Sequence, residues 1–243
     1  PHMPRARIGV LEIPAFYRDF RAEAEGKGDF RSTTRDVRAL INDLKRQGVD
    51  GILVDLRGNG GGSLTEATAL TGLFIDEGPV VQVKDSFGKV EVERDPDPGV
   101  AYTGPLAVLV DRSSASASEI FAGAMQDYGR GLIIGEPTFG KGTVQTLIDL
   151  NRYVPGNGDD LGRLRLTMAE FFRISGGSTQ LRGVEPDILF PTAQQNTDHG
   201  ERSLDNPLPW GSIRPAKYTK ASVTEVGLLR ERSNSRISHD PGF

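Results

Sequence analysis

Residues 51–66 read GILVDLRGNGGGSLTE and contain a strand, a glycine-rich turn and the start of a helix in direct succession. Gly51–Leu56 is a continuous apolar run, which is typical of a strand that is covered on both faces. After the glycines, Ser63 and Glu66 have the spacing of a capping box and predict a helix that begins at Leu64. A strand that passes through a tight turn into a helix is the repeating unit of an α/β domain.

A second stretch has the same organisation. Residues 106–119 read LAVLVDRSSASASE, in which the apolar run Leu106–Val110 precedes a serine-rich turn. Ser116 and Glu119 form another capping box, and the helix that they predict ends at Gly129. Ligands of open α/β sheets bind at the carboxyl ends of the strands, so both turns are candidate parts of one site.

The remaining periodicity agrees with a layered arrangement. Four apolar residues between positions 37 and 44 fall on one helix face, for which Thr34 is the expected N-cap and Gly48 the stop. Strands are predicted at Ile8–Ile13, Val80–Lys84, Lys89–Glu93, Leu132–Ile134, Thr143–Leu150 and Leu164–Phe172. The predicted fold class is therefore α/β, with a β-sheet and flanking helices.

The composition narrows the classes of function. The chain has 243 residues, enough for one large domain or two small ones, and a net charge of −4. No basic run stands out, so nucleic acid is not an expected partner. Cysteine is absent and only 3 histidines occur, which argues against thiolate or histidine-rich metal sites and against a histidine base. We therefore expect no metal and no cofactor.

A serine and a lysine are the candidate reactive groups. Capping alone accounts for Ser116 at a helix start, and its hydroxyl gains catalytic interest only beside a base. Among the lysines, Lys141 differs because glycines flank it on both sides in TFGKGT, residues 138–143. The alternative is a turn lysine that points to water, because lysine is rarely buried without a partner.

The region around Lys141 comes close to a phosphate-binding loop. Residues 135–141 fit the pattern G-x-x-x-x-G-K, but Gly142 stands where a serine or threonine would bind magnesium. The following residues, Thr143–Ile148, have the character of a strand, whereas such a loop opens a helix. We therefore do not expect nucleotide binding.

Several motifs taken together resemble one family. SASASE (residues 114–119), FGKGTVQ (139–145) and DLRGNGGG (55–62) are similar to motifs of the tail-specific, or C-terminal processing, serine proteases. MQDYG (125–129) and GVEPDI (183–188) resemble further motifs of that family, and the likeness extends from about Ile8 to beyond Trp210. Ser116 and Lys141 are 25 residues apart, which is the family's spacing of nucleophile and base.

The resemblance implies a Ser/Lys protease on a crotonase- or ClpP-like layered α/β core. It implies that Ser116 is the nucleophile, that Lys141 is the general base and that Gln145 orients the lysine. The backbone N–H groups of Gly62 and Ala117 would form the oxyanion hole. A lysine can act as a base only when neutral, and burial in an apolar pocket lowers the pKa of an amine in the required direction.

Further expectations follow from the same resemblance. Asp127 matches a family position tied to activity, with a structural role expected. The implied location is periplasmic or otherwise extracytoplasmic, with association with the inner membrane as one form of it. The implied partners are protein or peptide substrates with apolar C-termini, and an adaptor lipoprotein is a further candidate. Such proteases carry a PDZ domain, and we recognise none in this sequence.

The chain divides into three expected segments. Residues 1–7 combine a cloning scar with a lead-in, residues 8–193 form the protease core, and residues 194–243 turn polar, as the truncated start of a further region would. One alternative is that the truncated core is catalytically incompetent and acts as a peptide- or protein-binding module. Another is a crotonase-type acyl-thioester enzyme, whose oxyanion hole would look alike.

Overall fold

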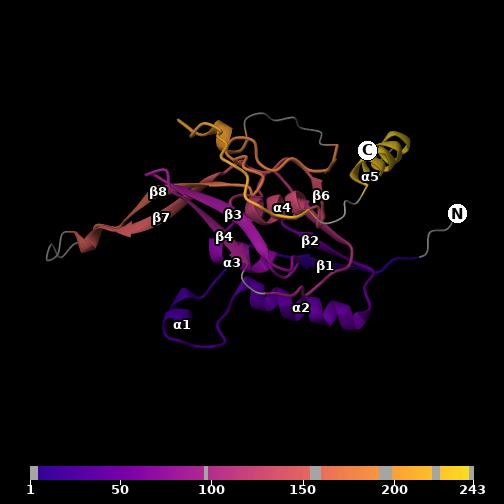
Figure 1. The fold of residues 1–243 in the computed structure, drawn as a ribbon, viewed down its shortest axis with the longest axis horizontal. Coiled ribbons are helices and arrows are strands. Elements are labelled where there is room, and N and C mark those ends of the chain that lie inside the picture. Colours follow the sequence, from indigo (N-terminus) through magenta and orange to yellow (C-terminus); the bar gives the residue numbers. More distant parts are fainter. Residues whose placement is uncertain (1–4, 96–97, 154–159, 192–198, 221–224, 241–243) are drawn as a thin grey trace.

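A parallel sheet of five strands, in the order β1–β2–β5–β6–β9, forms one layer of the molecule (Figure 1). The computed structural model describes residues 5–95, 98–153, 160–191, 199–220 and 225–240. The strands of this sheet are β1 Ile8–Glu12, β2 Gly51–Asp55, β5 Leu106–Val110, β6 Leu132–Gly135 and β9 Ile188–Leu189. Each pairs in parallel with its neighbour, so the carboxyl ends of all of them share one edge of the sheet.

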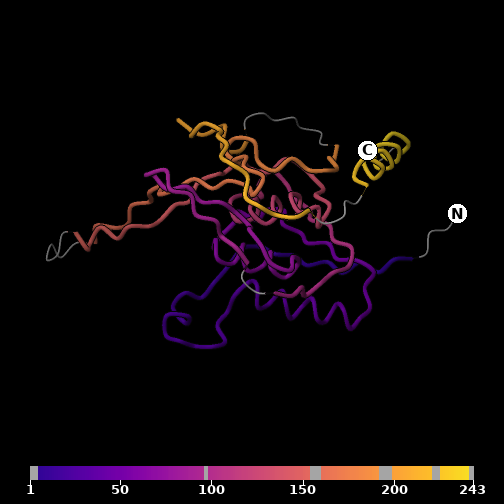
Figure 2. Tube along the Cα trace, in the orientation of Figure 1, coloured from indigo at the N-terminus to yellow at the C-terminus, as the bar shows by residue number. Residues whose placement is uncertain are grey.

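A second, antiparallel sheet has the order β4–β3–β8–β7. Its strands are β3 Gly78–Asp85, β4 Val90–Asp95, β7 Thr143–Asp149 and β8 Arg163–Phe172. The far parts of β7 and β8 extend away from the rest of the molecule as a hairpin (Figures 1 and 2). β7 is an edge strand of this sheet, and its register with β8 shifts between Val144 and Gln145.

Three helices pack against the sheets, and one of them contacts both sheets. α2 Thr33–Gln47 packs on β1, α3 Leu64–Thr71 packs on β3 and β4, and α4 Ala117–Tyr128 packs on both β6 and β3. Their buried side chains join those of the sheets in one hydrophobic core, and burying each large apolar side chain contributes about 1.5–3 kcal/mol. The remaining elements are α1 Phe20–Ala24, α5 Val226–His239 and two 3-10 turns, Leu150–Arg152 and Glu201–Ser203.

This arrangement confirms the predicted α/β class with a β-sheet and flanking helices. One predicted helix end is wrong, because Ser32 rather than Thr34 caps α2. The Ser32 hydroxyl accepts the Arg35 N–H at 3.2 Å, whereas the Thr34 hydroxyl donates to the Glu66 carboxylate at 2.7 Å. Gly48 ends the helix as predicted, in the left-handed conformation.

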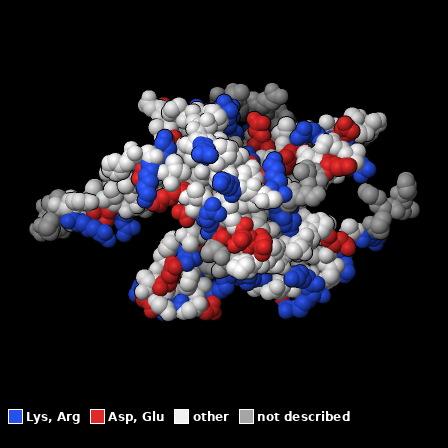
Figure 3. Space-filling model, in the orientation of Figure 1, with Lys and Arg blue, Asp and Glu red and all other residues white. Residues whose placement is uncertain are grey.

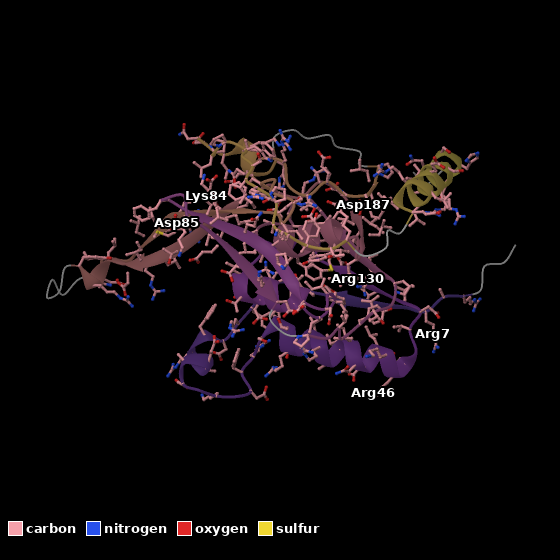
Figure 4. The ribbon with its side chains drawn as sticks, viewed as in Figure 1. Arg7, Arg46, Lys84, Asp85, Arg130 and Asp187 are labelled. Carbon is pink, nitrogen blue, oxygen red and sulfur yellow. The ribbon has the colours of Figure 1, made fainter. Side chains whose placement is uncertain are left out.

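The C-terminal part contains a helix, α5, that its polar composition did not lead us to expect. The Arg230 side chain on α5 donates to the Asp187 carbonyl oxygen at 2.9 Å. Asp187 lies between α4 and α5 (Figure 4), and its carboxylate accepts the Ile133 N–H at 2.9 Å. Hydrophobic periodicity does not reveal a polar contact of this kind.

Charged side chains of both signs are interspersed on the face of the molecule seen in Figure 3. Arg130, labelled in Figure 4, is half-buried instead, and its guanidinium donates to the carbonyl oxygens of Phe74, Tyr102 and Gly104 at 3.0, 2.7 and 3.0 Å. Arg130 therefore joins the loop after α3 to the loop before β5. Within the described ranges, no helix is long and apolar enough to cross a membrane.

Candidate active site

A buried asparagine holds together the glycine turn, residues 57–62 after β2, and the serine turn, residues 111–116 after β5. Asn59 is fully buried; its Nδ2 donates to the Ile13 carbonyl at 2.7 Å and its Oδ1 accepts the Gly61 N–H at 2.8 Å. The Asn59 backbone carbonyl accepts the Ala115 N–H at 3.0 Å and the Ser118 hydroxyl at 2.9 Å. One residue thus fixes the position of each turn relative to the other.

Ser116 has an unusual backbone conformation for a residue with a side chain. Its φ is 56° and its ψ is −111°, at the N-cap of α4. Such a conformation costs about 1–3 kcal/mol and persists only where surrounding contacts impose it. Gly61 lies against it: a Cβ added to Gly61 would come within 2.7 Å of the Ala115 carbonyl oxygen and 2.9 Å of the Ser116 Cβ. The two turns are therefore packed together at the serine.

Two backbone N–H groups near Ser116 have no acceptor within the described part of the chain. Ala117 is the first residue of α4, where N–H groups lack an intrahelical partner. Gly62 pairs with Phe16 in a bridge that leaves the Gly62 N–H unused. Both residues line the same cleft as the serine.

The carboxylate of Glu119 joins the serine turn to the lysine loop, residues 138–142. Glu119 is fully buried. Its carboxylate accepts four hydrogen bonds: from the Thr138 hydroxyl at 2.6 Å and from the N–H groups of Ser116, Gly140 and Lys141 at 2.8, 2.8 and 3.0 Å. Burial raises the pKa of Glu119 to about 7, although the hydrogen bonds act in the opposite direction. The glutamate therefore does more than complete the predicted capping box.

Lys141 is half-buried at the end of the lysine loop. Burial lowers the pKa of its amine and Arg165 lowers it further, whereas Glu201 and Glu119 raise it. Among the described residues, no hydrogen bond joins the amine to the Ser116 hydroxyl. In structures without substrate, catalytic hydrogen bonds are often long and tighten only in the complex.

Gln145 and Asp127 differ in their relation to the cleft. Gln145 is exposed on β7, which is a strand as predicted, and it lines the cleft without a hydrogen bond to Lys141 in the described structure. Asp127 lies near the other end of α4 and does not line the cleft. Its carboxylate accepts from the Arg173 guanidinium at 2.6 and 3.1 Å and from the Ser175 hydroxyl at 3.1 Å. The contacts of Asp127 therefore join α4 to the residues that follow β8.

One cleft of about 650 Å³ brings the other predicted site residues together. These are Gly62, Ser116, Ala117, Lys141 and Gln145. Apolar side chains form much of its wall, notably Phe16, Phe20, Leu64, Ile120, Val144 and Phe171. The cleft thus combines a hydroxyl, an amine of lowered pKa and two residues whose N–H groups have no acceptor among the described residues, beside an apolar surface.

Asn59 and Glu119 were not among the predicted site residues. Asn59 stands between glycines in RGNGGG, and Glu119 occupies the third position of a capping box, so both patterns had an ordinary explanation. Their role depends on contacts with distant segments, which local sequence does not show. In the ranges that the structure describes, no group of three or more histidines and carboxylates could hold a metal ion.

Comparison with known families and proteins agrees with the geometry. Residues 7–190 match peptidase family S41. The chain belongs to this family. Residues 194–243 of this S41 chain match a second description, the C-terminal domain of tail specific protease.

Individual relatives of the S41 chain carry related names. The chain is 45% identical over 241 residues to the tail-specific protease of Haemophilus influenzae, covering 97% of this chain and 33% of that protein. It is 37% identical over 167 residues to the chloroplastic C-terminal processing peptidase of Tetradesmus obliquus, covering 69% of this chain and 34% of that one. The chain therefore spans about a third of the length of these curated relatives.

A solved structure has the same fold. The photosystem II D1 C-terminal processing protease superimposes with a TM-score of 0.61 at 33% sequence identity, over 75% of this chain and 42% of that one. The layered arrangement of two sheets and flanking helices is thus the fold of an S41 protease.

Proposed function

We propose that this chain carries the catalytic core of a serine endopeptidase of the tail-specific, or C-terminal processing, type. The observation that carries the proposal is the cleft that Ser116 and Lys141 share with the free N–H groups of Gly62 and Ala117. A serine on a strained turn, an amine of lowered pKa and two unused donors are the groups that acyl transfer requires. Membership of peptidase family S41 supports the same reaction.

In the proposed mechanism, the neutral amine of Lys141 removes the proton of the Ser116 hydroxyl as its oxygen attacks the scissile carbonyl carbon. The oxyanion of the tetrahedral intermediate accepts hydrogen bonds from the N–H groups of Gly62 and Ala117. The intermediate collapses to a serine ester as the Lys141 ammonium gives its proton to the leaving amine. Lys141 then takes a proton from water, whose oxygen attacks the ester carbonyl carbon. The proton passes from Lys141 to the Ser116 oxygen as the ester C–O bond breaks and the carboxylic acid leaves, which restores the enzyme.

The proposal requires Lys141 to be neutral near its working pH. The ordinary lysine pKa of about 10.4 would have to fall by roughly 3 units to reach pH 7, which corresponds to about 4 kcal/mol. Half-burial acts in this direction, and full burial can shift a pKa by up to roughly 3–5 units. We propose that Gln145 orients the amine once substrate excludes water from the cleft, and that Asp127 acts through its contact with Arg173.

We further propose that the substrates are proteins with apolar C-terminal tails. The apolar wall of the cleft supports this, and so do the names of the relatives, which describe tail-specific and C-terminal processing enzymes. A periplasmic or otherwise extracytoplasmic location, association with the inner membrane and an adaptor lipoprotein as partner belong to the same proposal. The proposed chemistry uses no cofactor.

Two alanine variants of the full-length protein test the dyad. Ser116→Ala and Lys141→Ala are assayed with an unstructured protein that ends in an apolar tail, and we expect no cleavage above background. Ser113→Ala and Lys84→Ala are matched controls, because neither side chain lines the cleft, and we expect wild-type rates. Cleavage at the wild-type rate by either dyad variant would remove the assignment.

A serine-directed fluorophosphonate separates the protease from the binding-module alternative. We expect it to label Ser116 in the folded wild type and to leave Ser116→Ala unlabelled. A folded full-length protein that binds apolar-tailed peptides but takes no label would be a peptide-binding module instead.

A further inference from the structure

The segment from His199 to Gly211, coloured orange in Figure 2, is bound to the lysine loop. The Glu201 N–H donates to the Phe139 carbonyl at 3.0 Å, and the His199 and Phe139 rings meet edge to face with centroids 6.0 Å apart. Gly200, with a φ of 91°, permits this approach, because a Cβ there would lie 2.5 Å from the Phe139 carbonyl oxygen. The contact is therefore close-packed at the backbone.

A buried glutamine links the same two parts of the chain from the other side. Gln180 is 1% exposed, and its Oε1 accepts the Gly142 N–H at 2.8 Å. Its Nε2 donates to the Glu201 carboxylate and to the Leu208 carbonyl, each at 3.2 Å. Phe139, before the lysine, is thus joined directly to the C-terminal segment, and Gly142, after the lysine, is joined to it through Gln180.

Contacts further along hold this segment against the core. The Trp210 indole donates to the Ser178 carbonyl at 2.8 Å, and the Arg182 guanidinium lies over the Trp210 ring, 4.0 Å from its centroid. The Ser178 N–H donates to the Gly211 carbonyl at 3.0 Å. A cation over an indole ring contributes about 0.5–2 kcal/mol. The segment is therefore anchored independently of the lysine loop.

We propose that this segment, residues 199–211, is part of the catalytic unit and that Glu201 is a positioning residue for Lys141. The segment lies within the stretch that matches the C-terminal domain of tail specific protease, so that domain would complete the active site rather than merely follow it. The inference rests on the proposed function, because it requires Lys141 to be the base.

Glu201 also contributes charge at the site. Burial lowers the pKa of the Lys141 amine most; among the described residues, Glu201 and Glu119 raise it and Arg165 lowers it. Glu119 lies on α4, Arg165 on β8 and Glu201 in the C-terminal segment. Removing the negative charge of Glu201 therefore lowers the lysine pKa, so a larger fraction of the amine is neutral at acidic pH.

The test is Glu201→Gln in the full-length protein, with kcat/KM measured across pH. The glutamine retains an oxygen for the Gln180 amide and loses only the charge. We expect the acidic limb of the profile to move to lower pH by roughly half a unit. At a fixed pH on that limb, the variant should then reach about three times the fraction of its plateau activity that the wild type reaches. Glu231→Gln on α5 is the matched control, with the same charge change in the same domain, and its profile should coincide with that of the wild type.

The pH dependence of fluorophosphonate labelling at Ser116 gives a second readout, without substrate binding. It should move in the same direction in Glu201→Gln. An unshifted limb in both measurements would overturn the inference, even if Lys141→Ala is inactive and the proposed function stands. Glu201→Ala, which also removes the acceptor for Gln180, should lower the plateau as well; a plateau at the wild-type level would overturn the positioning role.

Discussion

Replacing Glu119 by glutamine separates the positioning of the active site from the stability of the fold. One carboxylate oxygen accepts from the Thr138 hydroxyl and the Gly140 N–H, and the other accepts from the N–H groups of Ser116 and Lys141. An amide has only one acceptor oxygen, so in either orientation two of the four donors lose their acceptor. Two buried donors without partners cost roughly 2–6 kcal/mol at about 1–3 kcal/mol each.

The ionisation of Glu119 in the wild type makes the stability lost in Glu119→Gln smaller at alkaline pH. The folded-state pKa of Glu119 is about 7, above its ordinary value of 4.5, so the folded state holds the proton more tightly. The stability that this proton provides is full below pH 4.5 and is lost as pH rises through 7, by up to about 3 kcal/mol. Glutamine does not ionise. We therefore expect Glu119→Gln to lose at most ~3 kcal/mol of unfolding free energy at pH 8 and more at pH 5.

Activity should fall much further than stability. In one amide orientation Ser116 and Lys141 lose their common acceptor, and in the other Thr138 and Gly140, just before Lys141, lose theirs. Either change can misplace a reacting group, and a misplacement of about 1 Å can cost about 10²-fold in rate. The assays are kcat/KM on an apolar-tailed substrate, and urea unfolding at pH 5 and pH 8. Glu185→Gln, an exposed change of the same kind, should leave both unchanged. A folded Glu119→Gln that keeps more than a tenth of wild-type kcat/KM, or the wild-type dependence of stability on pH, would refute the reasoning.

Three further outcomes follow from the same geometry. Gly61→Ala places a Cβ against the serine turn at a φ of 101° and should lower kcat/KM at least ~10-fold, whereas Gly60→Ala, which meets nothing within 4 Å, should be near wild type in the same assay. Asp127→Asn breaks the partly buried ion pair with Arg173 and should lower the free energy of unfolding in urea by about 2–4 kcal/mol. The exposed change Asp43→Asn is the control and should lower it by less than ~0.5 kcal/mol. Equal effects of the two changes would contradict a structural role of Asp127. Lys141→Met should abolish cleavage and stabilise the fold at pH 7 by at most ~1 kcal/mol, because the half-exposed amine keeps much of its hydration in the wild type. A melting temperature below that of the wild type would contradict an unfavourable environment for the lysine.

The regular elements could be predicted because their signals are local. The apolar runs in β2 and β5 and the glycine stops at Gly48 and Gly129 all lie within one element or its end. β9 could not be found in this way, because two residues, Ile188–Leu189, carry no periodicity. Nor could α5, since the side chain of Arg230 and the carbonyl of Asp187 meet only in the folded chain.

The residues of the proposed site likewise fall into those with a local sequence signal and those without one. Ser116, Lys141 and the glycine turn were found through motifs, because each motif is a short, continuous stretch. Glu119 contacts Thr138 and Lys141 across 19 and 22 residues, and nothing local to a capping box predicts such partners. Glu201 is further still from the lysine in sequence, and its contacts with Phe139 and Gln180 form only in the folded chain.

The backbone of Ser116 also bears on how a newly made polypeptide avoids digesting itself. An unfolded chain visits a φ of 56° with a ψ of −111° only fleetingly, and here the packing of Gly61 and the carboxylate of Glu119 hold the turn in place. In the proposed mechanism, the Ser116 hydroxyl therefore gains its geometry for attack only once these distant segments have folded together, which would protect the chain during synthesis.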